Sequence, residues 1–119
     1  MNSTHIIGNL ASDTELRTTP SGKEVCNFTV AVNRRKTQQN QDPGADFFRV
    51  SAWGDRGKTC HKFLNKGKKV SVVGPVSVRA YMNSKGEPAA SLEITADDVE
   101  FLSPRENIVD DPDDPFSGR

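Results

Sequence analysis

The segment ADFFRVSAWGD, residues 45–55, gathers three of the chain's eight aromatic side chains beside an arginine. Successive side chains of a β-strand point to opposite faces. If the segment is a strand, one face carries Phe48, Val50 and Ala52, an apolar set that is typical of a core. The other face carries a ring, a cation, a hydroxyl and a second ring, in the order Phe47, Arg49, Ser51 and Trp53.

Rings that alternate with cations favour contact with a single-stranded nucleic acid, because every base has a face that stacks and every linkage carries a phosphate. At about 3.3 Å per residue, Phe47 and Trp53 would lie about 20 Å apart, which is room for several unstacked nucleotides. The alternative is that both rings pack against a second layer or another subunit. The same cation-and-ring pattern recurs at Arg79 and Tyr81, and this repetition favours stacking.

Size and composition predict one domain. The chain has 119 residues, of which 34% are hydrophobic, and no apolar run of about eighteen residues that could span a membrane. Residues 1–10 lack the features of a secretion signal, so we expect a cytoplasmic protein. Cys26 and Cys60 are too far apart to indicate a disulfide framework, and with His5 and His61 they form no metal-binding spacing. We expect no metal and no other cofactor.

The net charge of zero is the sum of two unlike parts. Residues 1–102 hold 14 Lys and Arg against 11 Asp and Glu, which gives +3, whereas residues 103–119 hold 2 against 5, which gives −3. The chain is therefore a mildly basic body followed by an acidic tail. Basic clusters at residues 33–36 and 65–69 are suited to attract a polyanion, although clusters of this size also occur in ordinary solvated loops.

Alternating patterns predict a mainly β protein with five strands, near residues 3–10, 24–35, 45–55, 68–82 and 89–102. We interpret residues 11–24 as a connection, and Gly74-Pro75 as a bend inside the fourth strand. The expected inward residues are Cys26, Phe28, Val30, Val32, Val70, Val72, Val76, Val78, Ala80, Leu92, Ile94 and Ala96.

One short helix is expected within residues 54–67, stopped by Gly67, with an apolar stripe of Cys60, Phe63 and Leu64. Five strands with a helix between the third and fourth is the layout of the OB-fold. This fold is a small Greek-key barrel whose sheet face binds oligonucleotides or oligosaccharides.

Four blocks of the chain resemble the bacterial single-stranded DNA-binding proteins in both order and spacing. They are residues 7–34, DFFRVSAWGD at 46–55, HKFLNKGKKVSVVGPVSVRAY at 61–81, and DDPDDPF at 110–116. The resemblance implies an OB-fold domain over residues 1–102 that assembles as a homotetramer. It also implies sequence-independent wrapping of single-stranded DNA in the nucleoid, and recruitment of replication, recombination and repair proteins.

The resemblance places the family's stacking rings at Phe47, Trp53 and Tyr81. Its phosphate-facing cations correspond to Arg49, Arg79 and Lys66, with Arg34, Arg35 and Lys36 in a loop. Some relatives have a tryptophan where this chain has Arg35-Lys36, so we expect weaker stacking and a steeper salt dependence. Asp55 also differs from the pattern of the family, in which a basic residue often follows the AWG sequence.

Residues 103–119 have the composition of a disordered acidic tail. The resemblance implies that its tip binds partner proteins, with a ring in an apolar pocket and carboxylates on a basic rim. The tip residues are Asp111, Asp113, Asp114, Pro115 and Phe116. The alternative is a solubilising tail with an incidental ring. In typical relatives the phenylalanine is terminal, whereas residues 117–119 follow it here.

A second function compatible with this fold is that of a primosome-type accessory protein, dimeric and acting mainly through protein contacts. The acidic tip argues against it. The sequence shows no nucleophile–base arrangement, so we expect no enzymatic activity. An RNA-binding barrel of the cold-shock type would need short aromatic-rich motifs that this sequence lacks.

Overall fold

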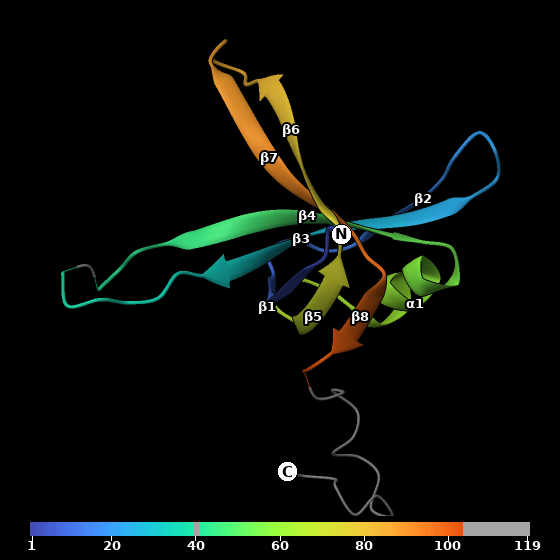
Figure 1. The fold of residues 1–119 in the computed structure, drawn as a ribbon. Helices are drawn as coiled ribbons and strands as arrows, with labels where there is room; N and C mark the ends of the chain where they lie inside the picture. Colours follow the sequence, from blue (N-terminus) through green and yellow to red (C-terminus); the bar gives the residue numbers. More distant parts are fainter. Residues whose placement is uncertain (40, 104–119) are drawn as a thin grey trace, which may run out of the picture.

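The computed structural model describes residues 1–39 and 41–103 (Figure 1). The first half contains strands β1 (Thr4–Leu10), β2 (Glu15–Thr18), β3 (Glu24–Asn33) and β4 (Ala45–Trp53). Helix α1 (Asp55–Phe63) follows. The second half contains β5 (Lys69–Gly74), β6 (Val76–Met82), β7 (Pro88–Thr95) and β8 (Asp98–Phe101).

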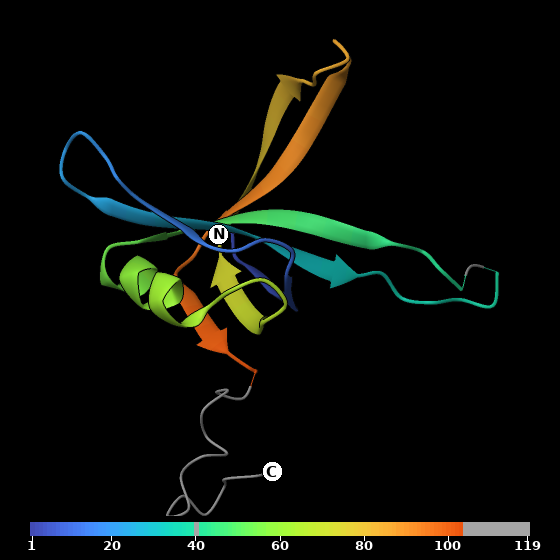
Figure 2. The ribbon, with the colours of Figure 1, turned by 180° about the vertical axis from the view of Figure 1, so that it is seen from behind.

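The strands form one sheet in the order β6-β7-β4-β3-β1-β5-β8, with β2 added to β3. All pairs are antiparallel except β4 with β7. Only a short bend separates β7, which pairs with β4, from β8, which pairs with β5. The sheet therefore closes into a small barrel, with α1 packed against β3 and β4 (Figure 2).

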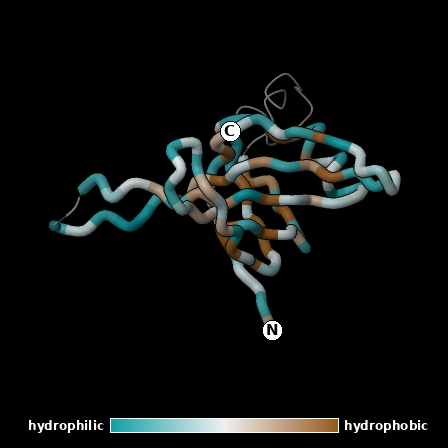
Figure 3. Tube along the Cα trace, turned by 90° about the horizontal axis from the view of Figure 1, so that it is seen from above, coloured by the Kyte–Doolittle hydropathy of each residue, from teal (hydrophilic) through white to brown (hydrophobic). Residues whose placement is uncertain are grey.

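The core confirms the predicted inward face of the central strands. Val50 and Ala52 of β4 are fully buried, and Phe48 packs against the same cluster. Apolar residues gather in the middle of the molecule, and the loop between β3 and β4 that extends to the left is mostly hydrophilic (Figure 3). The buried core residues include Cys26, Phe28, Val30, Cys60, Leu64, Val70, Val72, Ile94 and Ala96.

Both cysteines are free and buried. Burial raises the pKa of Cys60 to about 12, and it also raises the pKa of Cys26. Their thiols are therefore neutral at physiological pH and behave as small core groups, as predicted for Cys26. In the described part of the chain, His, Cys, Asp and Glu side chains form no group able to hold a metal ion. No helix within those residues is long and apolar enough to cross a membrane.

The predicted bend at Gly74-Pro75 divides the fourth predicted strand into β5 and β6. The amide of Asp97 donates to the carbonyl of Val73 at 2.7 Å, and the amide of Thr95 donates to the carbonyl of Pro75 at 3.2 Å. The break between β7 and β8 therefore lies beside the break between β5 and β6. Each of these two predicted strands turns a corner of the barrel.

The predicted inward placement of Val78 and Ala80 is wrong. Both residues are exposed, with 67% exposure for Val78, because β6 and β7 extend beyond the barrel as a projecting hairpin (top of Figure 1). Alternation identifies which residues share a face of a strand. It does not tell how far along the strand the core extends.

Two further predictions need correction. Residues 15–18, expected in a connection, form β2, in which Leu16 packs against the core between two exposed charged residues. Helix α1 ends at Phe63 rather than near Gly67, and Phe63 is 50% exposed with its ring centroid 6.2 Å from that of Phe101. Cys60 and Leu64 of the predicted stripe are buried as expected.

Gly57 lets α1 approach the sheet closely. A β-carbon at this position would lie 2.3 Å from the carbonyl oxygen of Ala52 in β4.

We expect Gly57→Ala to lower the free energy of unfolding by about 1–3 kcal/mol because the helix must move outward, even though alanine favours helix by about 1 kcal/mol. Urea unfolding measures the change. Arg56→Ala, one exposed position earlier, is the control; equal stability of the two variants would contradict the close packing.

Candidate nucleic-acid interface

The pairing register of β3 and β4 determines which residues share the outer face. Val25 lies opposite Trp53, and Ala31 lies opposite Phe47. Directly opposite residues of an antiparallel pair project to the same side. Phe47 is 58% exposed and Trp53 is 43% exposed, so no layer within the described residues seals either ring.

The same face continues over β7 and β6. Arg49 of β4 lies beside Glu93 of β7, while Arg79 and Tyr81 of β6 lie opposite Ser91 and Ala89 of β7. Because β7 connects the two strands, the cation-and-ring pattern of β6 lies on the side of the sheet that carries the rings of β4. Tyr81 is 45% exposed. We call this surface the aromatic face; it comprises Phe47, Arg49, Trp53, Arg79 and Tyr81.

Arg17 of β2 extends the aromatic face and was missed from the sequence. It lies opposite Val25, which lies opposite Trp53, so the three side chains form one row across the sheet. Its Nε donates to Asn27 Oδ1 at 3.2 Å, and Asn27 Nδ2 donates to Ser51 Oγ at 2.8 Å. In the sequence, the apolar Leu16 between the charged Glu15 and Arg17 indicates a short strand, but it does not indicate which strand pairs with it.

Glu93 is the other residue missed from the sequence. It lies next to Arg49 of β4 on one side and Ser77 of β6 on the other, and it is half-buried. A carboxylate among exposed cations reduces the local attraction for an anion. The aromatic face is therefore less positive at its centre than its arginines alone imply.

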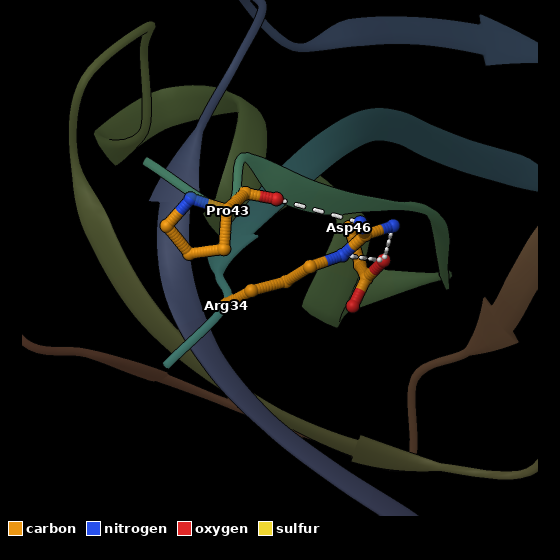
Figure 4. A network of polar contacts seen from close by, with 3 residues as sticks. All are labelled: Arg34, Pro43 and Asp46. Atoms are coloured by element: carbon orange, nitrogen blue, oxygen red, sulfur yellow. Dashed lines mark hydrogen bonds and ion pairs between the residues drawn. The ribbon is translucent and has the colours of Figure 1, made fainter. Parts of the chain in front are cut away.

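The loop cations differ in how they are held. Arg34 donates from Nη2 and Nε to Asp46 Oδ1 at 2.8 and 3.0 Å, and from Nη1 to the carbonyl of Pro43 at 3.4 Å (Figure 4). The hydrogen bond to Asp46 raises the pKa of the Arg34 guanidinium. The pair closes the base of the β3–β4 loop, whereas Arg35 and Lys36 follow it as exposed side chains.

Lys66 lies outside the rows of rings, in the turn between α1 and β5. Its amide donates to Asp13 Oδ1 at 2.8 Å, and Asn9 Nδ2 donates to the neighbouring carbonyl of Gly67 at 3.1 Å. Asn9 lies opposite Ala31, which in turn lies opposite Phe47. Lys66 therefore belongs to the rim of the sheet face.

The predicted partner-binding tip, residues 111–116, lies outside the described residues.

The chain matches the model of the single-strand binding protein family over residues 1–102. It is 38% identical over 110 residues to single-stranded DNA-binding protein 2 of Listeria monocytogenes, covering 92% of this chain and 69% of the relative. It is 37% identical over 105 residues to single-stranded DNA-binding protein 1 of Staphylococcus aureus, covering 88% and 67% respectively.

These findings confirm the predicted resemblance to the single-stranded DNA-binding proteins over residues 1–102. The closed barrel with one helix between its third and fourth predicted strands is the OB-fold implied by the family. Proteins of this family bind single-stranded DNA and are not enzymes. The chain belongs to the single-strand binding protein family.

Proposed function

We propose that this protein covers single-stranded DNA without reading its sequence, in support of replication, recombination and repair. The observation that carries the proposal is the aromatic face, on which three half-exposed rings and two arginines share one side of β4 and β6. The relatives named as single-stranded DNA-binding proteins support it. The expected location is the cytoplasm, at the nucleoid.

The chemistry of the aromatic face explains why binding is independent of sequence. Phe47, Trp53 and Tyr81 each offer a flat surface to one base, and each stacked base contributes about 1–3 kcal/mol. Every base has such a surface, so stacking does not distinguish one from another. Arg49 and Arg79 supply charge for phosphates between the rings, and Arg17 extends that charge past Trp53.

The loop between β3 and β4 supplies further phosphate contacts. Arg35 and Lys36 provide charge at positions where some relatives stack a base, and Arg34 keeps the base of the loop closed through Asp46. Lys66 contributes from the rim. A larger share of the binding free energy is then electrostatic, so affinity falls steeply with salt.

Assembly as a homotetramer is part of the proposal. Strand β1 pairs with β5 along residues 4–9 but with β3 only at Asn9 and Leu10, so one edge of residues 4–8 faces no strand of the described chain. Ile7 in this strand is 49% exposed. An open edge beside an exposed apolar residue is suited to pair with a second copy.

The acidic tip completes the proposal. Asp111, Asp113 and Asp114 would meet a basic rim on a replication or repair protein, while Pro115 and Phe116 enter its apolar pocket. Ser117, Gly118 and Arg119 follow the ring in the sequence. In this proposal, recruitment depends on the aspartates and the ring.

Removing either ring of β4 should weaken binding without unfolding the protein. We expect Phe47→Ala and Trp53→Ala each to cost about 1–3 kcal/mol of binding free energy to oligo-dT, measured by fluorescence anisotropy of a labelled oligonucleotide. Urea unfolding should be unchanged, since both rings are exposed. Phe63→Ala is the matched control, because its ring is also half-exposed but lies on α1. An equal loss of affinity in the control would contradict the assignment of the aromatic face.

Neutralising Glu93 should strengthen binding. We expect Glu93→Gln to lower the Kd for oligo-dT roughly two- to fivefold at low salt, since a unit charge about 6 Å from a phosphate in water is worth under 1 kcal/mol. The gain should vanish at high salt because of screening. Glu100→Gln, an exposed change on β8, is the control. Weaker binding by Glu93→Gln would show that the carboxylate instead orients Arg49 for the phosphate.

A further inference from the structure

An open hollow of about 400 Å³ lies at one end of the aromatic face, beside Trp53. Its other wall is the turn between β2 and β3, from which Thr19, Ser21 and Lys23 line it. Its volume lies within the range of small-molecule pockets, roughly 300–1,000 Å³. The hollow therefore places two hydroxyls and a cation next to a ring that is exposed for stacking.

The two walls of the hollow are fixed relative to each other. In the turn, the amide of Thr19 donates to the carbonyl of Lys23 at 2.7 Å, and the amide of Gly22 donates to the carbonyl of Thr19 at 2.9 Å. Gly22 has φ +87°, a conformation that favours glycine. The amide of Gly54, directly after Trp53, donates to the carbonyl of Glu24 at 2.8 Å. The end of β4 is therefore tied to the strand that leaves the turn.

The hydroxyls of the turn have a proton to donate. Thr19 Oγ1 lies 3.0 Å from Ser21 Oγ and accepts the amide of Lys23 at 3.2 Å. Whichever hydroxyl donates to the other, the pair uses one of its two protons and keeps the second. That second proton is available to an acceptor in the hollow, such as a phosphate oxygen.

The charge at the hollow is positive. Glu24, the acid next to Lys23 in sequence, forms an ion pair with Lys58 of α1, with Nζ 3.1 Å from Oε1. Its carboxylate is therefore engaged with another cation. Arg17 lies in the same row of the sheet as Trp53. Lys23 thus lines the hollow together with Trp53, and Arg17 lies two strands from Trp53 in the same row.

We propose that this hollow binds the phosphate adjacent to the base that stacks on Trp53. Lys23 supplies the charge, and the Thr19–Ser21 pair donates a hydrogen bond to a phosphate oxygen. The inference rests on the proposed binding of single-stranded DNA. It extends the path of the strand beyond the rings of β4 onto the β2–β3 turn, which the sequence indicated only as a connection.

Lys23→Gln tests the charge at the hollow, with Lys62→Gln on α1, beside Phe63, as the matched control. The slope of log K against log salt for oligo-dT should become shallower by about 0.7, the value for one phosphate contact on a single strand. Kd should rise about five- to tenfold at about 50 mM salt. Quenching of Trp53 at saturating DNA should persist, because the base still stacks.

The double variant Thr19→Val/Ser21→Ala removes both hydroxyls of the pair, and the variant Thr19→Ser keeps both. We expect the double variant to weaken binding roughly two- to fivefold with an unchanged salt slope, because no hydroxyl proton is left for the phosphate and a neutral hydrogen bond is lost. The serine variant should bind like the wild type. Equal affinities of the two variants would overturn the role of the hydroxyl.

The result for the wild type separates this inference from the proposed function. If wild-type protein binds oligo-dT but Lys23→Gln matches it in Kd and in salt slope, the phosphate site is wrong and the proposed function stands. If wild-type protein does not bind oligo-dT, the proposed function fails, and the phosphate site fails with it.

Discussion

The register of β4 with its neighbours is the constraint on which the aromatic face depends. Burying Val50 and Ala52 in the core forces the alternate residues Phe47 and Trp53 to the opposite side. A slip of one residue would turn every side chain to the other face and put two large rings into the barrel. The free energy that folds the barrel therefore also exposes the rings.

Charge on the aromatic face is balanced rather than maximal. Glu93 lies beside Arg49, and Asp46 holds Arg34 at the base of the β3–β4 loop. We propose that stacking, which salt screens little, holds the strand while the cations tune affinity to ionic conditions.

The sequence predicted the parts of the site that local alternation determines. Parity alone identified the rings of β4, and the burial of Val50 supports that assignment, whereas the cation-and-ring pair of β6 was identified because it repeats the pattern of β4. It could not find Arg17 or Glu93, because their neighbours come from pairing between segments far apart in the chain. It also misplaced Val78, since the length of a projecting hairpin depends on where the barrel ends rather than on the pattern of the strand.

Trp53 is the chain's single tryptophan, so its fluorescence reports directly on the aromatic face. The most direct measurement is a titration of the protein with oligo-dT, followed by tryptophan emission at several salt concentrations. The account predicts quenching that saturates with DNA, with a log K that falls linearly as log salt rises. Binding seen by an independent method with no change in Trp53 emission would contradict it, because the strand would then lie elsewhere on the protein.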